Sequence, residues 1–414
     1  MLNVRNKMKH MLMTTSENIT TGYGIVAKNL MKGLLKKGID IKQLGLQNLG
    51  HQSKESQLPV LDNIYGADAL EFYTKLYGID SLITILDNWL PQYEWLPNYI
   101  KRLNLNHICH VTIHSEPLPP ILHNSIRNAN FWVAPSKFVE KVLLNAGYDP
   151  KRVRYIAHGV DTKIFKPLPE EEKQKYRELM GYENKFVWIA VATNTGLEKN
   201  WQGLFYAYKV FLTQNPEAAK DTVLHCHTSP HYPGGSSYDL EVLGKMYGIA
   251  DNLRFVAGMN LNAGTPPEEM TRFYNIADCY ISSTMGESFH LPALESMACG
   301  TPCIIPNNTT GPQLVGEPKT GFLTELLKMK NGQEFGWTGP NISDKWIIDP
   351  VDMADKMSEM YRDKKLREKF SKNAVKFAKK FDWKTKIIPQ WIDFFNYVEE
   401  FIEPTNYKEK KLGI

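Results

Sequence analysis

Residues 286–295 read GESFHLPALE, and this stretch decides how the rest of the chain is interpreted. The apolar run Cys279–Ser283 before it predicts a β-strand, and a helical pattern begins near Leu291. The first turn of a helix presents unpaired backbone N–H groups and a partial positive charge, which suit a diphosphate. Glu295 lies about one turn into that helix, within reach of ribose hydroxyls, and Glu287 lies in the loop, where it can face a sugar.

Strand and helix patterns alternate on both sides of this stretch, in two successive series. The segment Lys166–Lys185 interrupts them with two prolines and the acidic run Glu170–Glu172, and it predicts a domain boundary. Alternating strands and helices indicate parallel sheets covered on both faces. We therefore expect an α/β fold of two Rossmann-like, doubly wound domains facing a cleft, over residues 1–165 and 166–382. Residues 383–414 are expected to form a C-terminal helix plus a tail.

Composition sets broad limits on the class of protein. The 414 residues are 43% apolar and 23% charged, which is typical of a soluble globular chain long enough for two domains. No apolar run approaches the roughly 18 residues of a membrane-spanning helix, so a cytoplasmic location is expected. The five cysteines are odd in number and mostly lie in apolar runs, which favours buried thiols over a disulfide framework.

Charge is unevenly distributed along the chain. Residues 1–165 carry 19 Lys and Arg against 13 Asp and Glu, whereas residues 166–414 carry 30 against 32. A basic first half suits an anionic partner, such as a phosphorylated lipid or a membrane surface, and the basic helix Lys28–Lys37 could lie on such a surface. An ordinary lysine-rich surface explains the charge equally well. Nucleic acid ranks lower, because no dense groove pattern of basic and aromatic residues is present.

Residues 277–304, ADCYISSTMGESFHLPALESMACGTPCI, resemble the hallmark of glycosyltransferase family 4 and its glycogen-synthase-like relatives. That hallmark has two glutamates separated by seven residues around a Phe-x-Leu-Pro core. The resemblance extends to His158–Asp161, Phe165–Pro167, Pro135-Ser136 and Lys199-Asn200. It implies the GT-B fold, a retaining transferase that uses a nucleotide-sugar donor, and a last helix that returns to the N-terminal domain.

The resemblance also assigns the residues of a donor site. Lys199, before the first helix of the second domain, would place a charge on the diphosphate. The family has an arginine five residues earlier, where this chain has Asn194, a neutral donor. Asn194 is therefore assigned to the donor-binding residues, and Thr193, Asn194 and Thr195 are expected to help with hydrogen bonds. The donor-binding set also includes the residues of the hallmark loop and helix: Ser288, Phe289, His290, Leu291 and Glu295.

Two of these positions depart from the family pattern. Ser288 and His290 replace the glycines that flank Phe289, and glycine permits close backbone approach to a ligand. Side chains there would narrow the sugar pocket or add a hydrogen bond to a hydroxyl. The identity of the donor sugar and of its base is therefore open.

Two residues of the first domain complete the predicted site. Gly22 belongs to the loop Thr20–Gly24, which in the family touches the donor phosphate or the acceptor. His114 follows the strand Ile108–Ile113, and the family has a histidine here that contacts the transferred sugar. A histidine that merely caps a strand end is the alternative.

The expected chemistry needs neither metal nor cofactor. The sequence contains no Asp-x-Asp motif for a divalent cation, and the helix N-terminus with Lys199 offers another way to stabilise a departing diphosphate. His225-Cys226-His227 lacks a matching second pair of zinc ligands. His114, Glu287 and Lys199 are thus the expected catalytic residues. A decayed sugar-nucleotide-binding protein, or an epimerase or phosphorylase on the same scaffold, remains the alternative.

Overall fold

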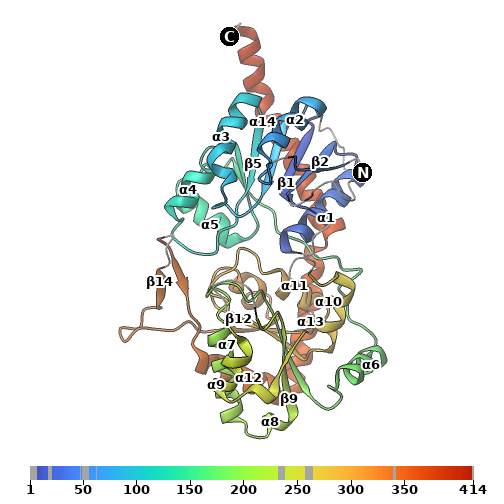
Figure 1. The fold of residues 1–414 in the computed structure, drawn as a ribbon, viewed down its shortest axis with the longest axis vertical. Helices are drawn as coiled ribbons and strands as arrows, with labels where there is room; N and C mark the ends of the chain where they lie inside the picture. Colours follow the sequence, from blue (N-terminus) through green and yellow to red (C-terminus); the bar gives the residue numbers. More distant parts are fainter. Residues whose placement is uncertain are drawn as a thin grey trace. The chain divides into compact units, whose positions relative to one another are not determined.

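The computed structural model describes residues 7–16, 21–46, 48, 56–61, 63–231, 238–256, 264–338 and 342–412, with side chains to residue 402. The chain divides into two compact units. The first contains Met1–Thr112, Leu118–Gly159 and Phe381–Ile414, and the second contains Ile113–Pro117 and Val160–Lys380. Each unit is a layered α/β structure with its own sheet (Figure 1).

The first unit is built on a seven-stranded sheet in the order β3-β2-β1-β4-β5-β6-β7. Every neighbouring pair in it is parallel. Its strands are β1 (His10–Thr15), β2 (Ile41–Leu46), β3 (Gln57–Pro59), β4 (Ser81–Ile85), β5 (Asn106–His110), β6 (Phe131–Ala134) and β7 (Val153–Tyr155). Its helices are α1 (Gly22–Lys36), α2 (Ala67–Tyr77), α3 (Gln92–Leu103), α4 (Pro120–Ile126), α5 (Lys137–Asn145) and α14 (Ile388–Leu412).

The last helix belongs to this first unit. Phe394 and Phe395 of α14 are buried, and Phe131 of β6 packs edge-on against Phe394. A Cβ on Gly33 of α1 would lie 2.4 Å from the side chain of Ile388, so glycine allows α1 to approach the start of α14 closely. The return of the final helix to the N-terminal part of the chain was expected from the resemblance.

The second unit contains a six-stranded parallel sheet in the order β10-β9-β8-β11-β12-β13. Its strands are β8 (Phe186–Val191), β9 (Thr222–His227), β10 (Leu253–Phe255), β11 (Cys279–Ile281), β12 (Cys303–Pro306) and β13 (Gly321–Thr324). Its helices are α6 (Glu170–Met180), α7 (Trp201–Gln214), α8 (Ala218–Asp221), α9 (Leu240–Tyr247), α10 (Pro267–Ile276), α11 (Leu291–Ala298), α12 (Pro350–Arg362) and α13 (Lys364–Ala378).

A hairpin interrupts the second unit between β13 and α12. Its strands β14 (Gly336–Thr338) and β15 (Asp344–Trp346) pair antiparallel and form a separate small sheet. Its backbone is fixed to the unit at two points, because Asp344 N donates to Glu116 O (3.0 Å) and Trp346 N donates to Met285 O (3.2 Å).

The fold class predicted from the sequence is confirmed: both sheets are parallel and carry helices between their strands. Several elements were missed, namely β3, α3, α4, α8, β13 and the hairpin, because their short or mixed patterns carry little periodicity. β5 ends at His110 rather than at Ile113. The chain passes from the first unit to the second after Gly159 and returns to the first unit at Phe381, whereas the sequence placed boundaries after residues 165 and 382.

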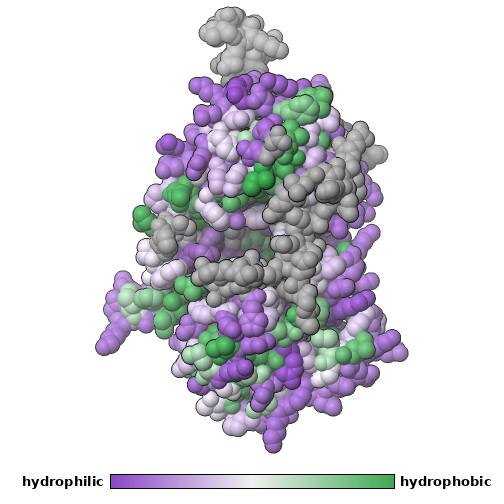
Figure 2. Space-filling view, in the orientation of Figure 1, coloured by the Kyte–Doolittle hydropathy of each residue, from purple (hydrophilic) through white to green (hydrophobic). Residues whose placement is uncertain are grey.

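Apolar side chains fill the interior of each unit. A large cluster in the second unit includes Trp188, Trp201 and Phe211, all almost completely buried. Hydrophilic side chains predominate on the face shown in Figure 2. The five cysteines are buried and unpaired. No helix in the described part of the chain is long and apolar enough to cross a bilayer.

Candidate active site

The decisive stretch forms a loop and a helix start, as its sequence predicts. β11 ends at Ile281, and α11 begins at Leu291. Gly286 lies where a Cβ would be 2.0 Å from the carbonyl oxygen of His114, so no other residue fits without moving backbone. This close approach places the loop directly against the segment Ile113–Pro117 of the same unit.

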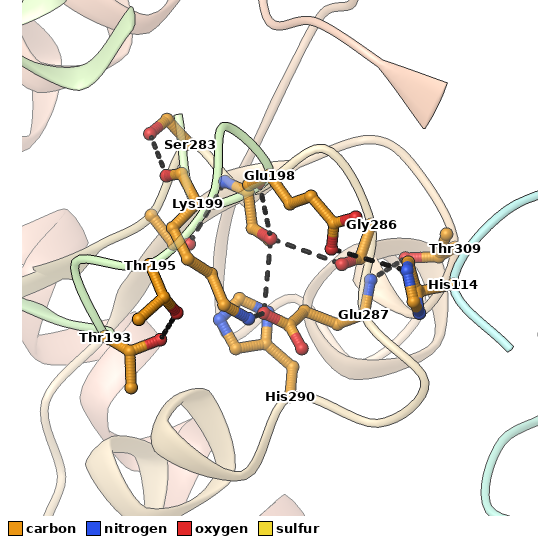
Figure 3. A network of polar contacts seen from close by, with 12 residues as sticks. His114, Thr193, Thr195, Glu198, Lys199, Ser283, Gly286, Glu287, His290 and Thr309 are labelled. Atoms are coloured by element: carbon orange, nitrogen blue, oxygen red, sulfur yellow. Dashed lines mark hydrogen bonds and ion pairs between the residues drawn. The ribbon is translucent and has the colours of Figure 1, made fainter. Parts of the chain in front are cut away.

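Lys199 and Glu287 lie together, although 88 residues separate them in the sequence. Lys199 Nζ donates to Glu287 Oε1 over 2.6 Å, and Thr284 Oγ1 donates to the same oxygen over 3.2 Å (Figure 3). Burial alone would raise the pKa of Glu287, but the charge of Lys199 and neighbouring groups outweighs it, and the net shift is downward. The pair therefore consists of an ammonium and a carboxylate.

The loops that carry this pair are held by their own hydrogen bonds. Ser283 Oγ donates to Lys199 O (3.2 Å) and to Asn200 O (2.8 Å), which fixes the loop before α7. Glu287 N donates to Thr309 Oγ1 (3.1 Å), which fixes the other loop. Both charged side chains are about one quarter exposed, so a ligand can reach them.

Glu295 lies about one turn after the first residue of α11, Leu291. Its carboxyl group is buried and accepts a hydrogen bond from Tyr274 Oη (3.0 Å). Burial raises the pKa of Glu295 to about 7, while the Tyr274 hydrogen bond works in the opposite direction. A buried carboxyl group with one neutral partner can accept further hydrogen bonds from hydroxyl groups.

His290 occupies an unusual backbone position. Its φ of 75° and ψ of 60° lie in the left-handed region, where glycine is the default residue. The side chain is buried, and its Nε2 pairs with Tyr280 Oη (3.0 Å). Burial lowers the pKa of His290 to about 4. The ring therefore packs into the unit, with one nitrogen engaged internally, instead of offering both nitrogens to a sugar. Phe289 is buried as well, whereas Ser288 and Leu291 are partly exposed.

Asn194 is buried and engaged with neighbouring backbone. Its side-chain nitrogen donates to the carbonyl oxygens of Ser229 (3.3 Å), Pro230 (3.2 Å) and Tyr238 (2.7 Å). The residue is 1% exposed. Its N–H groups thus hold neighbouring backbone beside the end of β8. Thr195 Oγ1 donates to Thr193 Oγ1 (3.0 Å).

His114 is brought to the loop before α7. Its Nε2 lies 3.4 Å from Glu198 Oε2 (Figure 3), and Glu198 Oε1 accepts a hydrogen bond from Lys345 Nζ. Glu198 and Lys345 were not predicted. The position of Glu198 next to Lys199 was a weak signal, and nothing in the sequence around Lys345 marked it.

Gly22 is the first residue of α1 in the first unit, where Thr21 Oγ1 caps the helix by accepting from Gly24 N (3.3 Å). Thr20, from the same predicted loop, lies outside the described residues. Over the described ranges, no group of three or more His, Cys, Asp or Glu side chains has a metal-binding arrangement.

Comparison with known proteins finds a family match inside the second unit. Residues 234–328 match the family model of glycosyl transferases group 1. The matched range includes Glu287, Glu295 and α11, so the resemblance stated for the hallmark stretch is confirmed.

The curated relatives that match this chain include several glycosyltransferases of one name. A D-inositol 3-phosphate glycosyltransferase of Corynebacterium jeikeium is 28% identical over 57% of this chain and 50% of the relative. The Corynebacterium efficiens protein of the same name is 24% identical over 77% of this chain and 72% of the relative. The chain thus spans about half the length of the first of these relatives.

Solved structures confirm the GT-B fold of the chain. Sucrose-phosphate synthase from Thermosynechococcus elongatus superposes with a TM-score of 0.73 over 96% of this chain and all of the synthase, at 16% identity. The HepE protein of Anabaena, solved in complex with UDP and glucose, superposes with a TM-score of 0.66 over 94% of this chain and 99% of HepE, at 14% identity. At these identities the likeness concerns the fold alone.

Proposed function

We propose that the chain transfers a sugar from a nucleotide-sugar donor to an acceptor hydroxyl, with retention of anomeric configuration and without a metal ion. The observation that carries this proposal is the contact of 2.6 Å between Lys199 and Glu287, in the loop that leads into α11. It joins a cation suited to a diphosphate with a carboxylate suited to sugar hydroxyls.

Charge development explains how these groups would act. Glycosyl transfer passes through an oxocarbenium-like state while negative charge grows on the leaving diphosphate. The N-terminus of α11 and the Lys199 ammonium stabilise that charge, and Glu295 holds the ribose. No side chain is assigned as a nucleophile. A front-face reaction, in which the leaving phosphate accepts the acceptor's proton, is consistent with retention.

The donor is proposed from the relatives and from the site. HepE binds UDP-glucose in a solved complex, and two of the curated relatives are named for D-inositol 3-phosphate. We extend the nucleotide-sugar donor to this chain. A phosphorylated saccharide or a lipid-linked group is the proposed acceptor class. The net positive charge of residues 1–165 suits either one. A cytoplasmic enzyme with peripheral membrane contact through that part of the chain fits the second acceptor.

A specific observation keeps a non-catalytic alternative open. Asn194 stands where an arginine is expected, and its amide is engaged with backbone carbonyls. A protein that binds a sugar nucleotide without transferring the sugar would tolerate this loss of positive charge.

Transfer of an isotope-labelled sugar tests the proposal. Wild type is incubated with labelled nucleotide sugars and candidate acceptors in the presence of EDTA, and NMR of the product reports the anomeric configuration. We expect turnover with retention, and a loss of about 100-fold or more in kcat/KM for Lys199→Met. Lys245→Met, on the exposed face of α9, is the matched control and should keep wild-type rates.

Binding of the donor without any labelled product would instead support the non-catalytic alternative. Inversion of configuration, or complete loss of turnover with EDTA that added Mg²⁺ restores, would overturn the corresponding part of the proposal.

A further inference from the structure

Glu198 lies between two positively charged or ionisable side chains in the second unit. One carboxylate oxygen, Oε2, is 3.4 Å from His114 Nε2, and the other, Oε1, accepts a hydrogen bond from Lys345 Nζ. Figure 3 shows the Glu198 side chain directed toward His114 rather than toward Glu287. A single carboxylate therefore links a predicted catalytic residue to the hairpin.

Lys345 is buried, which is unusual for a lysine. Its side chain is only 5% exposed, and lysines are almost never buried without a partner of opposite charge. Glu198 is that partner, since it receives the ammonium hydrogen bond. Removing either charge alone would lower the free energy of unfolding, or the remaining side chain would move to a new position.

The hairpin also braces the segment that carries His114. Ser343 Oγ donates to Ser115 Oγ (2.7 Å), and both side chains are buried. Next to this contact, the backbone hydrogen bond from Asp344 N to Glu116 O ties the two segments together. The same short stretch thus positions His114 through backbone and side-chain bonds and delivers Lys345 to Glu198.

Glu198 is held as a carboxylate. The hydrogen bond with His114 is the main cause that lowers the pKa of Glu198, burial opposes it, and Lys345 adds to the lowering, so that the pKa falls to about 2. A carboxylate can only accept hydrogen bonds. The His114 nitrogen at this contact, Nε2, must therefore be one that carries a proton.

A second ion pair lies beyond His114, because Glu287 pairs with Lys199 over 2.6 Å. His114 acts electrostatically on both Glu198 and Glu287. A change in the contact between Glu198 and His114 therefore alters the field at the proposed sugar-binding end.

We propose that Glu198 is a positioning residue that fixes the orientation and Nε2–H tautomer of His114, and that Lys345 of the hairpin holds Glu198 in place for this task. The proposal rests on the proposed function in one respect, the contact between His114 and the transferred sugar. Under it, the hairpin is part of the transfer machinery rather than a surface decoration.

Kinetics with matched variants test the proposal. Glu198→Gln and Lys345→Met should lower kcat about 10- to 100-fold, because a misplaced catalytic group costs rate rather than donor affinity. The Kd for the donor nucleotide should stay within about twofold of the wild-type value. Lys345→Arg keeps the charge and should restore most of the rate. The double variant should be no slower than the worse single variant.

Lys328→Met provides the control for the hairpin region. Lys328 precedes β14, is half exposed, and pairs with Glu325 over 3.1 Å on the surface. Its substitution should leave kcat unchanged. Equal rates for wild type, Glu198→Gln and Lys345→Met, with folded proteins by circular dichroism, would overturn the proposal.

A second measurement is independent of turnover. Nitrogen NMR of ¹⁵N-histidine-labelled protein reports the tautomer of each ring, and His114→Gln identifies the His114 signals. The wild type should show the Nε2–H form, and Glu198→Leu should show a mixture of both forms. An unchanged tautomer in Glu198→Leu would contradict the proposal. If wild type transfers no sugar, the proposed function fails, and the tautomer still decides whether Glu198 orients His114.

Discussion

Glu295 is the residue whose protonation bears most directly on the donor site. It is buried against Tyr274, and burial raises its pKa to about 7. A carboxylate accepts hydrogen bonds from two ribose hydroxyls, whereas the protonated acid has one fewer acceptor position and carries a competing proton. Near neutral pH the Glu295 carboxyl group therefore holds both forms, and we expect donor binding to select the ionised one.

This coupling predicts a pH-dependent affinity. A nucleotide sugar has no ionisation of its diphosphate between pH 6 and 8, so the dependence reports the protein. The Kd of wild type should fall about tenfold from pH 6 to pH 8, since the ionised fraction of Glu295 rises about tenfold across a pKa near 7. Calorimetry at three pH values measures it. Glu295→Gln should bind more weakly and without this slope; an equal slope in both proteins would show that another group titrates.

Residues of the site differ in how far the sequence could predict them. Glu287 and Glu295 belong to one continuous segment, whose spacing and flanking residues carry the pattern. The contact between Glu198 and Lys345 joins residues 147 apart, and no local pattern encodes such a pairing. Asn194 was assigned from its position alone, but its environment of three carbonyl oxygens decides where its amide points.

At the scale of elements, α14 illustrates what periodicity predicts well. The sequence predicts a C-terminal helix within residues 383–414, and Trp391, Phe394 and Phe395 of that helix are buried in the first unit. Phe395 stacks on His10 of β1 with ring centroids 4.3 Å apart. The C-terminal helix therefore supplies part of the core on which β1 packs.

Substitution of Phe395 tests that role. Phe395→Ala should lower the free energy of unfolding of the first unit by about 3–5 kcal/mol, because a buried ring is removed and a cavity remains. Phe72→Ala, at a half-exposed position on α2, should cost less than about 1 kcal/mol. Urea unfolding followed by circular dichroism gives both values. A similar small cost at both positions would mean that α14 is not part of that core.

The hairpin was missed for the opposite reason. β14 and β15 have three residues each, and their polar and glycine-rich surroundings give no alternation. Contacts with Glu116 and Met285, from distant parts of the sequence, hold them in place. Short elements of this kind depend on tertiary structure rather than on local preference.

At the scale of the whole molecule, buried histidines make stability depend on pH. Burial lowers the pKa of His10 and His158 in the first unit to about 4, and that of His227 in the second unit to about 4. Unfolding returns each ring to an ordinary pKa near 6.5. The unfolded chain then binds more protons, so the stabilising contribution is complete above pH 6.5 and decreases as the pH falls toward 4.

The melting temperature should therefore fall steadily between pH 6.5 and pH 5, above the range where ordinary carboxylates titrate. One such histidine contributes roughly 2 kcal/mol of this loss at pH 5. Neither ring nitrogen of His10 has a hydrogen-bond partner among the described residues. His10→Leu should thus flatten the curve without losing a hydrogen bond to them. Glu295 has the opposite effect on stability, because its raised pKa makes the folded chain bind a proton that the unfolded chain releases. A melting temperature that is constant over this range, or an unchanged slope in His10→Leu, would contradict this account.

The donor site is the central claim, and a thermal-shift titration tests it most directly. Wild type, Lys199→Ala and Glu295→Ala are titrated with UDP, GDP, ADP, CMP and dTDP without metal, since a ligand that binds only the folded protein raises its melting temperature. We predict that one nucleotide stabilises the wild type and that both variants lose this effect. No stabilisation by any nucleotide, or equal stabilisation of the variants, would contradict the assignment of Lys199, Glu287 and Glu295 to a donor site.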